Sequence, residues 1–292
     1  MTSWDGARAI QLTNRTGESE SAPRFSPDGH WLAFVSGRGA EAGETQLWIM
    51  DLAGGEGRKL PGIKGSVSDY AWSPDSKWIA LVLDDPDPEA DATKTTTVTV
   101  TKPDAAAAKP DAGATSPAAT VVTAKDKPPK PIVIDRFHFK QDRESYLGKK
   151  HQRLWLYDLA KGAASRLTIG DYDEGLPAWS PDGKSLAFVS NHAADPDRSF
   201  NSNLYVVKVG PKTSEPVALT TFEGENNSAQ FGSYPAWSPD GREIAYLQGG
   251  PVKLISYGVR SLAVVPTAGG TPRVLTAALE SVRFRHTHTR HA

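Results

Sequence analysis

Three carboxylates gather in one short stretch of the chain, Asp171-Tyr-Asp-Glu174. An acidic loop of this kind can hold a cationic group such as the amino terminus of a peptide. Two arginines earlier in the chain, Arg136 and Arg143, can complement a carboxylate or a peptide carbonyl. We therefore take Asp171, Asp173, Glu174, Arg136 and Arg143 as the candidate substrate-binding residues. A second interpretation, a solvated acidic loop without a ligand, stays open because surface loops are commonly charged.

An aspartate also recurs at the same position of a repeated motif, Ser-Pro-Asp-Gly. The repeated aspartates could be interpreted as a ring of acidic side chains. The four near-copies place Asp28, Asp75, Asp182 and Asp240 at this position, and the second of them ends in Ser76 in place of glycine. Because an aspartate in a turn bonds its own backbone, we predict local capping and no catalysis from these residues. A tryptophan precedes the phrase in three copies, at Trp72, Trp179 and Trp237. We expect these rings to be core side chains and not platforms for a ligand.

The last residues of the chain contain alternating histidines. On a strand, His286 and His288 would share a face and could bind Zn²⁺ weakly. No acidic residue or cysteine is adjacent, and Arg283, Arg285 and Arg290 would repel a cation. We expect no metal site here, no cofactor elsewhere, and an irregular tail over residues 277–292.

The repeated phrase also predicts the elements that must position these residues. Each copy lies between a short strand ending in Trp or Phe and an apolar strand such as Lys184-Ser-Leu-Ala-Phe-Val-Ser190. A third strand follows, and a fourth closes the unit at 58–61, 165–168, 217–220 and 273–276. Four antiparallel strands in a unit of about 40 residues are typical of one blade of a β-propeller. The sequence therefore predicts an all-β fold, a partial β-propeller of about four blades.

The spacing of the copies predicts the domain organisation. Pro27 and Pro74 are 47 residues apart and Pro181 and Pro239 are 58 apart, but Pro74 and Pro181 are 107 apart. The excess is a segment rich in Ala, Pro, Thr, Asp and Lys, which we expect to form a flexible insert over 84–131. The predicted blades are about 23–61, 70–168, 177–220 and 235–276. They form one domain over residues 1–292, with 131–139 as a strand re-entering the second blade.

A fifth copy of the closing strand stands at 9–13, ahead of the first complete unit. The sequence after residue 276 holds no further turn phrase, so we expect an arc of blades and not a closed ring. Such an arc exposes apolar faces that a ring would bury. This predicts self-association through exposed blade edges or dependence on a partner.

Composition excludes several classes of protein. The 292 residues carry 33 basic and 34 acidic side chains, so the net charge of −1 does not favour binding to nucleic acid or to an anionic membrane. There is no cysteine, and therefore no disulfide, thiol nucleophile or cysteine metal site. The chain has no apolar leader as written and no run of 18 apolar residues. We expect a soluble, cytoplasmic protein.

The Trp-Ser-Pro-Asp-Gly repeat resembles the repeat of TolB-type propellers. A narrower resemblance lies in three segments, 130–148, Gly170-Asp-Tyr-Asp-Glu-Gly-Leu-Pro-Ala-Trp-Ser-Pro-Asp-Gly183 and Leu186-Ala-Phe-Val-Ser-Asn191. They resemble the N-terminal propeller of serine peptidases of the prolyl oligopeptidase family, in the branch of the acylaminoacyl peptidases and dipeptidyl aminopeptidases. The resemblance covers most of residues 8–276 apart from the insert.

This resemblance implies a propeller that restricts access to the Ser-Asp-His site of an α/β-hydrolase domain. It also implies that propeller carboxylates hold the amino terminus of a peptide substrate. The chain contains no Gly-x-Ser-x-Gly, so no nucleophile can be placed and no peptidase activity is expected from it alone. Its expected partners are a peptide substrate or an α/β-hydrolase domain. The alternatives are a stand-alone TolB-type propeller acting as an interaction scaffold, and a propeller enzyme of another class, which would need clustered His, Asp or Glu.

Overall fold

The computed structural model describes residues 6–7, 9, 11–13, 19–40, 44–85, 134, 137–138, 140–141, 145–146, 151–199, 201–210, 214–227 and 233–276. Contacts within the chain divide it into two compact units, one of residues 1–86 with 149–292 and one of residues 87–148. The described elements are strands apart from the two short 3-10 helices η2 (Pro196–Arg198) and η4 (Val252–Tyr257). No helix among these residues is long and apolar enough to cross a membrane.

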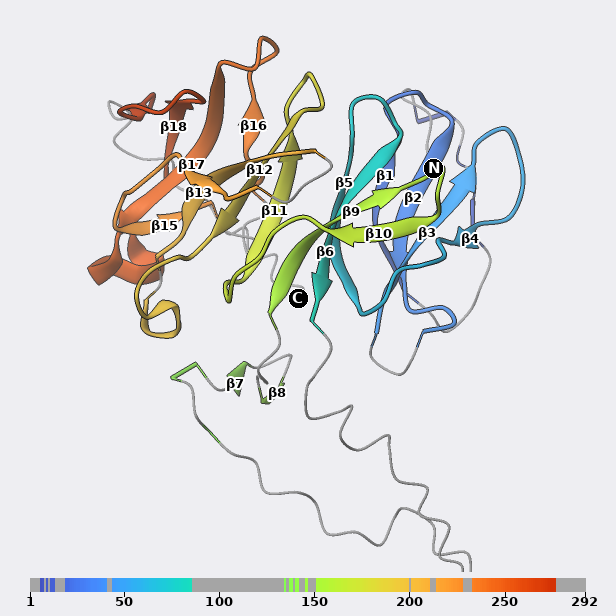
Figure 1. Cartoon of the computed structure of the whole chain (residues 1–292), viewed down its shortest axis with the longest axis horizontal. Coiled ribbons are helices and arrows are strands. Elements are labelled where there is room, and N and C mark those ends of the chain that lie inside the picture. Colours follow the sequence, from blue (N-terminus) through green and yellow to red (C-terminus); the bar gives the residue numbers. More distant parts are fainter. Residues whose placement is uncertain are drawn as a thin grey trace, which may run out of the picture. The chain divides into compact units, whose positions relative to one another are not determined.

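The larger unit holds four antiparallel sheets that follow one another along the chain (Figure 1). The first blade has the strand order β1 (Glu20–Phe25), β2 (Trp31–Ser36), β3 (Gln46–Asp51) and β4 (Arg58–Lys59). The second contains β5 (Val67–Trp72), β6 (Trp78–Asp84), β9 (Gln152–Asp158) and β10 (Ala163–Arg166). The third contains β11 (Glu174–Trp179), β12 (Ser185–Ser190), β13 (Asn203–Lys208) and β14 (Val217–Ala218).

In the fourth blade, the place of the first strand is taken by two short segments that both pair with β17 (Glu243–Pro251). These segments are β15 (Gly224–Asn226) and β16 (Ala236–Trp237). The blade continues with β18 (Ser261–Pro266) and β19 (Arg273–Val274). Among the described strands, none of the first sheet pairs with a strand of the fourth. The predicted fold class, a partial β-propeller, is confirmed.

The insert joins two neighbouring strands of one sheet. β6 pairs with β9 from Trp78↔Asp158 to Asp84↔Gln152, and Figure 1 shows these two strands side by side although they are far apart in the chain. The unit of residues 87–148 has a described two-stranded sheet of β7 (Lys140–Gln141) and β8 (Ser145–Tyr146). Most of the predicted insert, most of the predicted strand at 131–139 and the whole tail at 277–292 lie outside the described residues.

The predicted closing strand at 9–13 is not a regular strand where it is described. Ala9 forms an isolated bridge, residues 11–13 have no strand conformation, and Ile10 lies outside the described residues. The closing strands of the four blades do form, as β4, β10, β14 and β19.

The core consists of apolar clusters that form between successive blades. One cluster joins Leu47 and Leu60 of the first blade to Ile79 and Tyr157 of the second. Two more clusters join the second blade to the third and the third to the fourth. Alternate residues of each central strand point to opposite faces, so a single strand such as β12 contributes to the clusters on both sides of its sheet. Burial between sheets, and not within them, therefore stabilises the unit.

Candidate functional site

The four aspartates of the turn phrase bond their own turns. In each turn the preceding serine hydroxyl donates to the carboxylate, at 2.5 Å for Ser26–Asp28 and 2.6 Å for Ser180–Asp182. The same carboxylates accept a backbone N–H two residues on, from His30 and Lys184. The pKa of Asp28, Asp182 and Asp240 is lowered. The hydrogen bond from the serine hydroxyl is the largest cause, and the hydrogen bond from the backbone N–H is the second. The predicted capping role is confirmed.

The acidic loop at residues 170–174 is positioned by a buried arginine from the neighbouring blade. Arg153, on β9, is 3% exposed. Its Nη1 donates to the carbonyl oxygens of Gly170 and Tyr172, the latter at 2.9 Å. Its Nε donates to Asp85 at 2.9 Å, and its Nη2 contacts Asp171 at 3.3 Å. A single guanidinium thus fixes the backbone of the loop and pairs with two carboxylates.

The three predicted carboxylates of this loop have different surroundings. The Asp171 side chain is 96% exposed and that of Asp173 is 58% exposed. Oδ1 of Asp173 accepts the Gln152 backbone N–H at 3.0 Å and contacts His151 Nδ1 at 3.2 Å. Asp171 and Asp173 are therefore the members of the set that solvent, or a ligand, can reach.

Glu174 is instead 3% exposed, at the first position of β11. Its Oε2 accepts the backbone N–H of Leu154 at 3.0 Å and the hydroxyl of Thr168. Burial raises the pKa of Glu174 against these hydrogen bonds, which favour the charged form. The side chain joins the third blade to β9 and to the segment after β10. Its predicted contact with a ligand stays a prediction, as do those of Asp171 and Asp173, whereas Arg136 and Arg143 lie outside the described residues.

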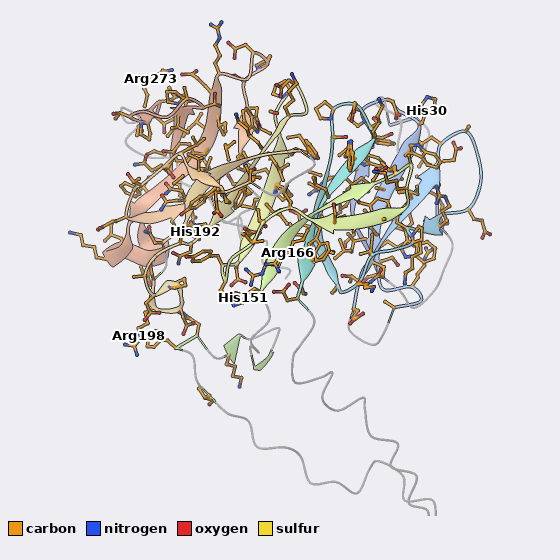
Figure 2. The ribbon with its side chains drawn as sticks, viewed as in Figure 1. His30, His151, Arg166, His192, Arg198 and Arg273 are labelled. Carbon is orange, nitrogen blue, oxygen red and sulfur yellow. The ribbon has the colours of Figure 1, made fainter. Side chains whose placement is uncertain are left out.

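An aromatic stack supports the other side of the loop. The ring of Tyr172 stacks on His192 at a centroid distance of 3.8 Å, and His192 lies 4.1 Å from Tyr205 of β13. Burial lowers the pKa of His192, so the imidazole is neutral near pH 7. His151 and His192, which contact Asp173 and Tyr172 of this loop, are labelled in Figure 2 together with Arg166. Arg153 and the stack together hold the backbone that presents Asp171 and Asp173.

The first strands of two blades and the segment just before β16 meet at a second polar cluster, which the sequence reasoning missed. Arg24 of β1 donates through Nη2 to Asp69 of β5 at 2.9 Å and to the Tyr234 hydroxyl at 2.8 Å. The Tyr234 hydroxyl also donates to Asp69 at 2.9 Å. The guanidinium lies 4.7 Å from the ring centroid of Tyr70 and 5.1 Å from that of Tyr234. We call Arg24, Asp69, Tyr70 and Tyr234 the Arg24 cluster.

A departure from the repeat could have revealed this cluster. Arg24 stands where the other three copies have alanine, at Ala71, Ala178 and Ala236. Asp69-Tyr70 stands where the other copies have a residue followed by proline. Positions that break a structural repeat indicate a local role, and here that role is to join the first, second and fourth blades by hydrogen bonds.

Chemically, the acidic loop can bind a cation, because its exposed carboxylates lie on a backbone that is already ordered. No group of three His, Cys, Asp or Glu side chains suited to a metal ion occurs among the described residues. Binding of a cationic group at Asp171 and Asp173 stays a prediction.

The fold is that of a partial β-propeller, and comparisons with known proteins show what the chain is similar to. No protein-family model matches the chain. An uncharacterized peptidase of Bacillus subtilis, YuxL, is 30% identical over 192 residues, which are 65% of this chain and 25% of that protein. The chain thus matches about a quarter of the length of this curated relative.

Solved structures show the same fold at low identity. The acylaminoacyl peptidase of Pyrococcus horikoshii matches with a TM-score of 0.54 and 17% identity, over 89% of this chain and 32% of the peptidase. The tricorn protease matches with a TM-score of 0.54 and 13% identity, over 94% of this chain and 24% of the protease. The resemblance to propellers of prolyl oligopeptidase family peptidases, predicted from the sequence, is confirmed.

Proposed function

We propose that this chain is a non-catalytic β-propeller that positions peptide substrates for a serine peptidase domain of the α/β-hydrolase type. The observation that carries the proposal is the 30% identity to a peptidase over 192 residues in a chain without a Gly-x-Ser-x-Gly motif. The peptidases among the structural neighbours support the same assignment at the level of the fold.

The acidic loop supplies the contact with substrate. Asp171 and Asp173 present exposed carboxylates, and Arg153 and the Tyr172–His192 stack hold the loop before any ligand arrives. A peptide with a free amino terminus carries the complementary charge. An exposed ion pair of this kind contributes about 0.2–1 kcal/mol. The propeller would therefore orient and select substrates and would not bind them tightly.

Binding of matched peptides to the purified chain tests this assignment. We expect a tripeptide with a free amino terminus to bind more tightly than its N-acetylated form, as measured by NMR titration at low salt. Asp171→Asn should weaken binding of the free peptide by about two- to fivefold, the equivalent of one exposed ion pair. It should leave the acetylated peptide unaffected.

Asp240→Asn is the matched control, because Asp240 is a turn carboxylate bound to Ser238 in the fourth blade. Equal affinity for the two peptides, or equal loss in both variants, would remove the acidic loop from the proposed function. Hydrolysis of a peptide by the purified chain alone would contradict the non-catalytic assignment.

A further inference from the structure

The first strands of the blades are edge strands that lie next to one another. β1, β5 and β11 each stand at one end of the strand order of their sheets. The indole N–H of Trp72, at the end of β5, donates to the carbonyl of Arg24 on β1 at 3.2 Å. That of Trp179, at the end of β11, donates in the same way to Ala71 on β5 at 3.0 Å. The first strands therefore form one continuous surface, to which Arg24 and Asp69 belong.

The packing of these strands does not require an arginine. The position equivalent to Arg24 holds alanine in the other three blades, at Ala71, Ala178 and Ala236. The carbonyls of Ala71 and Ala178 accept an indole N–H just as that of Arg24 does. The guanidinium of Arg24 is therefore available for a role that the repeat itself does not demand.

This guanidinium uses only part of its hydrogen-bonding capacity within the described chain. Its Nη2 donates to Asp69 Oδ1 at 2.9 Å and to the Tyr234 hydroxyl at 2.8 Å. No described residue accepts from Nε or Nη1, which carry the other N–H donors of the fork. The side chain of Arg24 is 29% exposed, and these two nitrogen atoms are not buried. Solvent or a ligand can therefore reach them.

The guanidinium is also held in place before any ligand arrives. The rings of Tyr70 and Tyr234 lie on it, and Tyr70 is itself 0% exposed, with its hydroxyl bonded to the carbonyl of Ala22 at 2.6 Å. Both oxygens of Asp69 are engaged, because Oδ1 also accepts the Tyr70 backbone N–H at 2.8 Å and Oδ2 accepts the Tyr234 hydroxyl. An arginine fixed in this way loses little freedom when an anion binds to its free donors.

We propose that the free donors of Arg24 bind the C-terminal carboxylate of a peptide. The inference rests on the proposed function for the identity of the ligand as a peptide. A carboxylate is the planar oxyanion that a guanidinium matches. The ring of Tyr234, which is 39% exposed, lies beside the guanidinium and would contact the last side chain of the peptide. We call Nε and Nη1 of Arg24, with the exposed ring of Tyr234, the carboxylate site.

Acetylated peptides separate this site from the acidic loop. N-acetyl-Ala-Ala-Leu with a free carboxylate is compared with its C-terminal amide, so that neither peptide carries the amino group expected at Asp171 and Asp173. We expect the acid to bind wild type at least about fivefold more tightly than the amide at low salt. The indole N–H resonance of Trp72 reports binding, because this group donates to the carbonyl of Arg24. The indole of Trp237, which donates to Ala178, is the reference signal.

Three variants test the residues of the site. Arg24→Ala introduces the residue that the other three blades have, and it should abolish the preference for the acid. Arg242→Ala removes the same charge from an exposed turn and should retain the preference. Asp69→Asn keeps an oxygen acceptor for Arg24 and removes a negative charge beside the ligand, so the acid should bind at least about twofold more tightly than to wild type. If Arg24→Ala does not fold, Asp69→Asn decides alone.

Four outcomes would overturn the inference. The first is equal affinity of wild type for the acid and the amide. The second is a preference that Arg24→Ala retains, or that Arg242→Ala also loses, because general surface charge then explains it. The third is unchanged or weaker binding of the acid to Asp69→Asn. The fourth is competition by sodium acetate as strong as that by the peptide acid, which identifies a small anion as the ligand.

The proposed function can fail independently of the carboxylate site. Equal binding of peptides with free and acetylated amino termini would remove the acidic loop and leave the preference for the acid intact. Equal binding of the acid and the amide would remove the carboxylate site and leave the effect of Asp171→Asn intact. The two failures are therefore distinguishable in one set of titrations.

Discussion

Glu174 begins the strand β11 and Asp182 lies in the turn that follows it, and the two carboxylates have opposite surroundings. Asp182 is exposed, bonds the hydroxyl and backbone of its own turn, and has a lowered pKa. Glu174 is buried, bonds Leu154 and Thr168 outside its own strand, and has a raised pKa. The difference teaches that the carboxylate of the turn phrase acts within its own turn, whereas the carboxylate at the start of the strand acts between elements.

The same contrast separates the two kinds of position in the acidic loop. Asp171 and Asp173 are exposed because Arg153 and Glu174 take up the buried polar contacts below them. Arg153 and Glu174 thus form a buried layer, and Asp171 and Asp173 form an exposed layer. Substitutions in the two layers should change the stability of the protein by different amounts.

The largest effect is expected from Arg153→Met. This change removes a buried charge that serves Asp85, Asp171 and two loop carbonyls, and it leaves these groups without their donor. Loss of hydrogen bonds to a charged group should cost about 1.5–3 kcal/mol in the free energy of unfolding. Urea denaturation followed by tryptophan fluorescence measures this loss.

Arg242→Met is the matched control for Arg153, because Arg242 is 85% exposed and its contact with Asp240 is 3.8 Å long. We expect a loss below about 1 kcal/mol there. A similar loss in both variants would contradict the division into a buried and an exposed layer.

A smaller effect, with a distinctive pH dependence, is expected from Glu174→Gln. The loss of one hydrogen bond partner should cost about 1 kcal/mol. The folded-state pKa of Glu174 is raised, so its protonation contributes stability that is full below the unfolded-state pKa and is lost as pH rises through the folded-state pKa. Wild type should therefore lose stability relative to Glu174→Gln as the pH rises through this range. A stability difference that is constant with pH would contradict the raised pKa.

The smallest effect is expected from Asp182→Ala in the turn between β11 and β12. The folded-state pKa of Asp182 is lowered, so its contribution is present above the unfolded-state pKa and is lost as pH falls through the folded-state pKa. The melting temperatures of variant and wild type should therefore converge on acidification, the opposite direction to Glu174→Gln. Divergence of the two melting curves at low pH would show that the turn hydrogen bonds do not favour the charged carboxylate.

The sequence was sufficient for the blades because each blade is encoded locally. The turn phrase determines a hairpin, and alternation of apolar residues determines the two faces of its strands. The pairing of β6 with β9 across the insert also follows from the sequence, because the two strands have the residue pattern of the second and third strands of a repeat. Of the strand expected at 9–13, the described residues show an isolated bridge at Ala9 and no regular strand at 11–13.

The arrangement of the candidate site could be predicted from the sequence only in part. A run of three acids does not reveal that Glu174 is buried and Asp171 exposed, because this depends on Arg153 from another blade. The Arg24 cluster draws on residues 24, 69, 70 and 234, whose proximity requires the first strands to converge.

What the sequence determined by itself is the repeat, its turns, its strands and the resemblance to peptidase propellers. These depend on interactions between residues a few positions apart. Only the tertiary structure decided which carboxylates are buried and which residues join the blades. Those properties arise from the packing of one sheet on the next, where residues distant in the chain exclude water together.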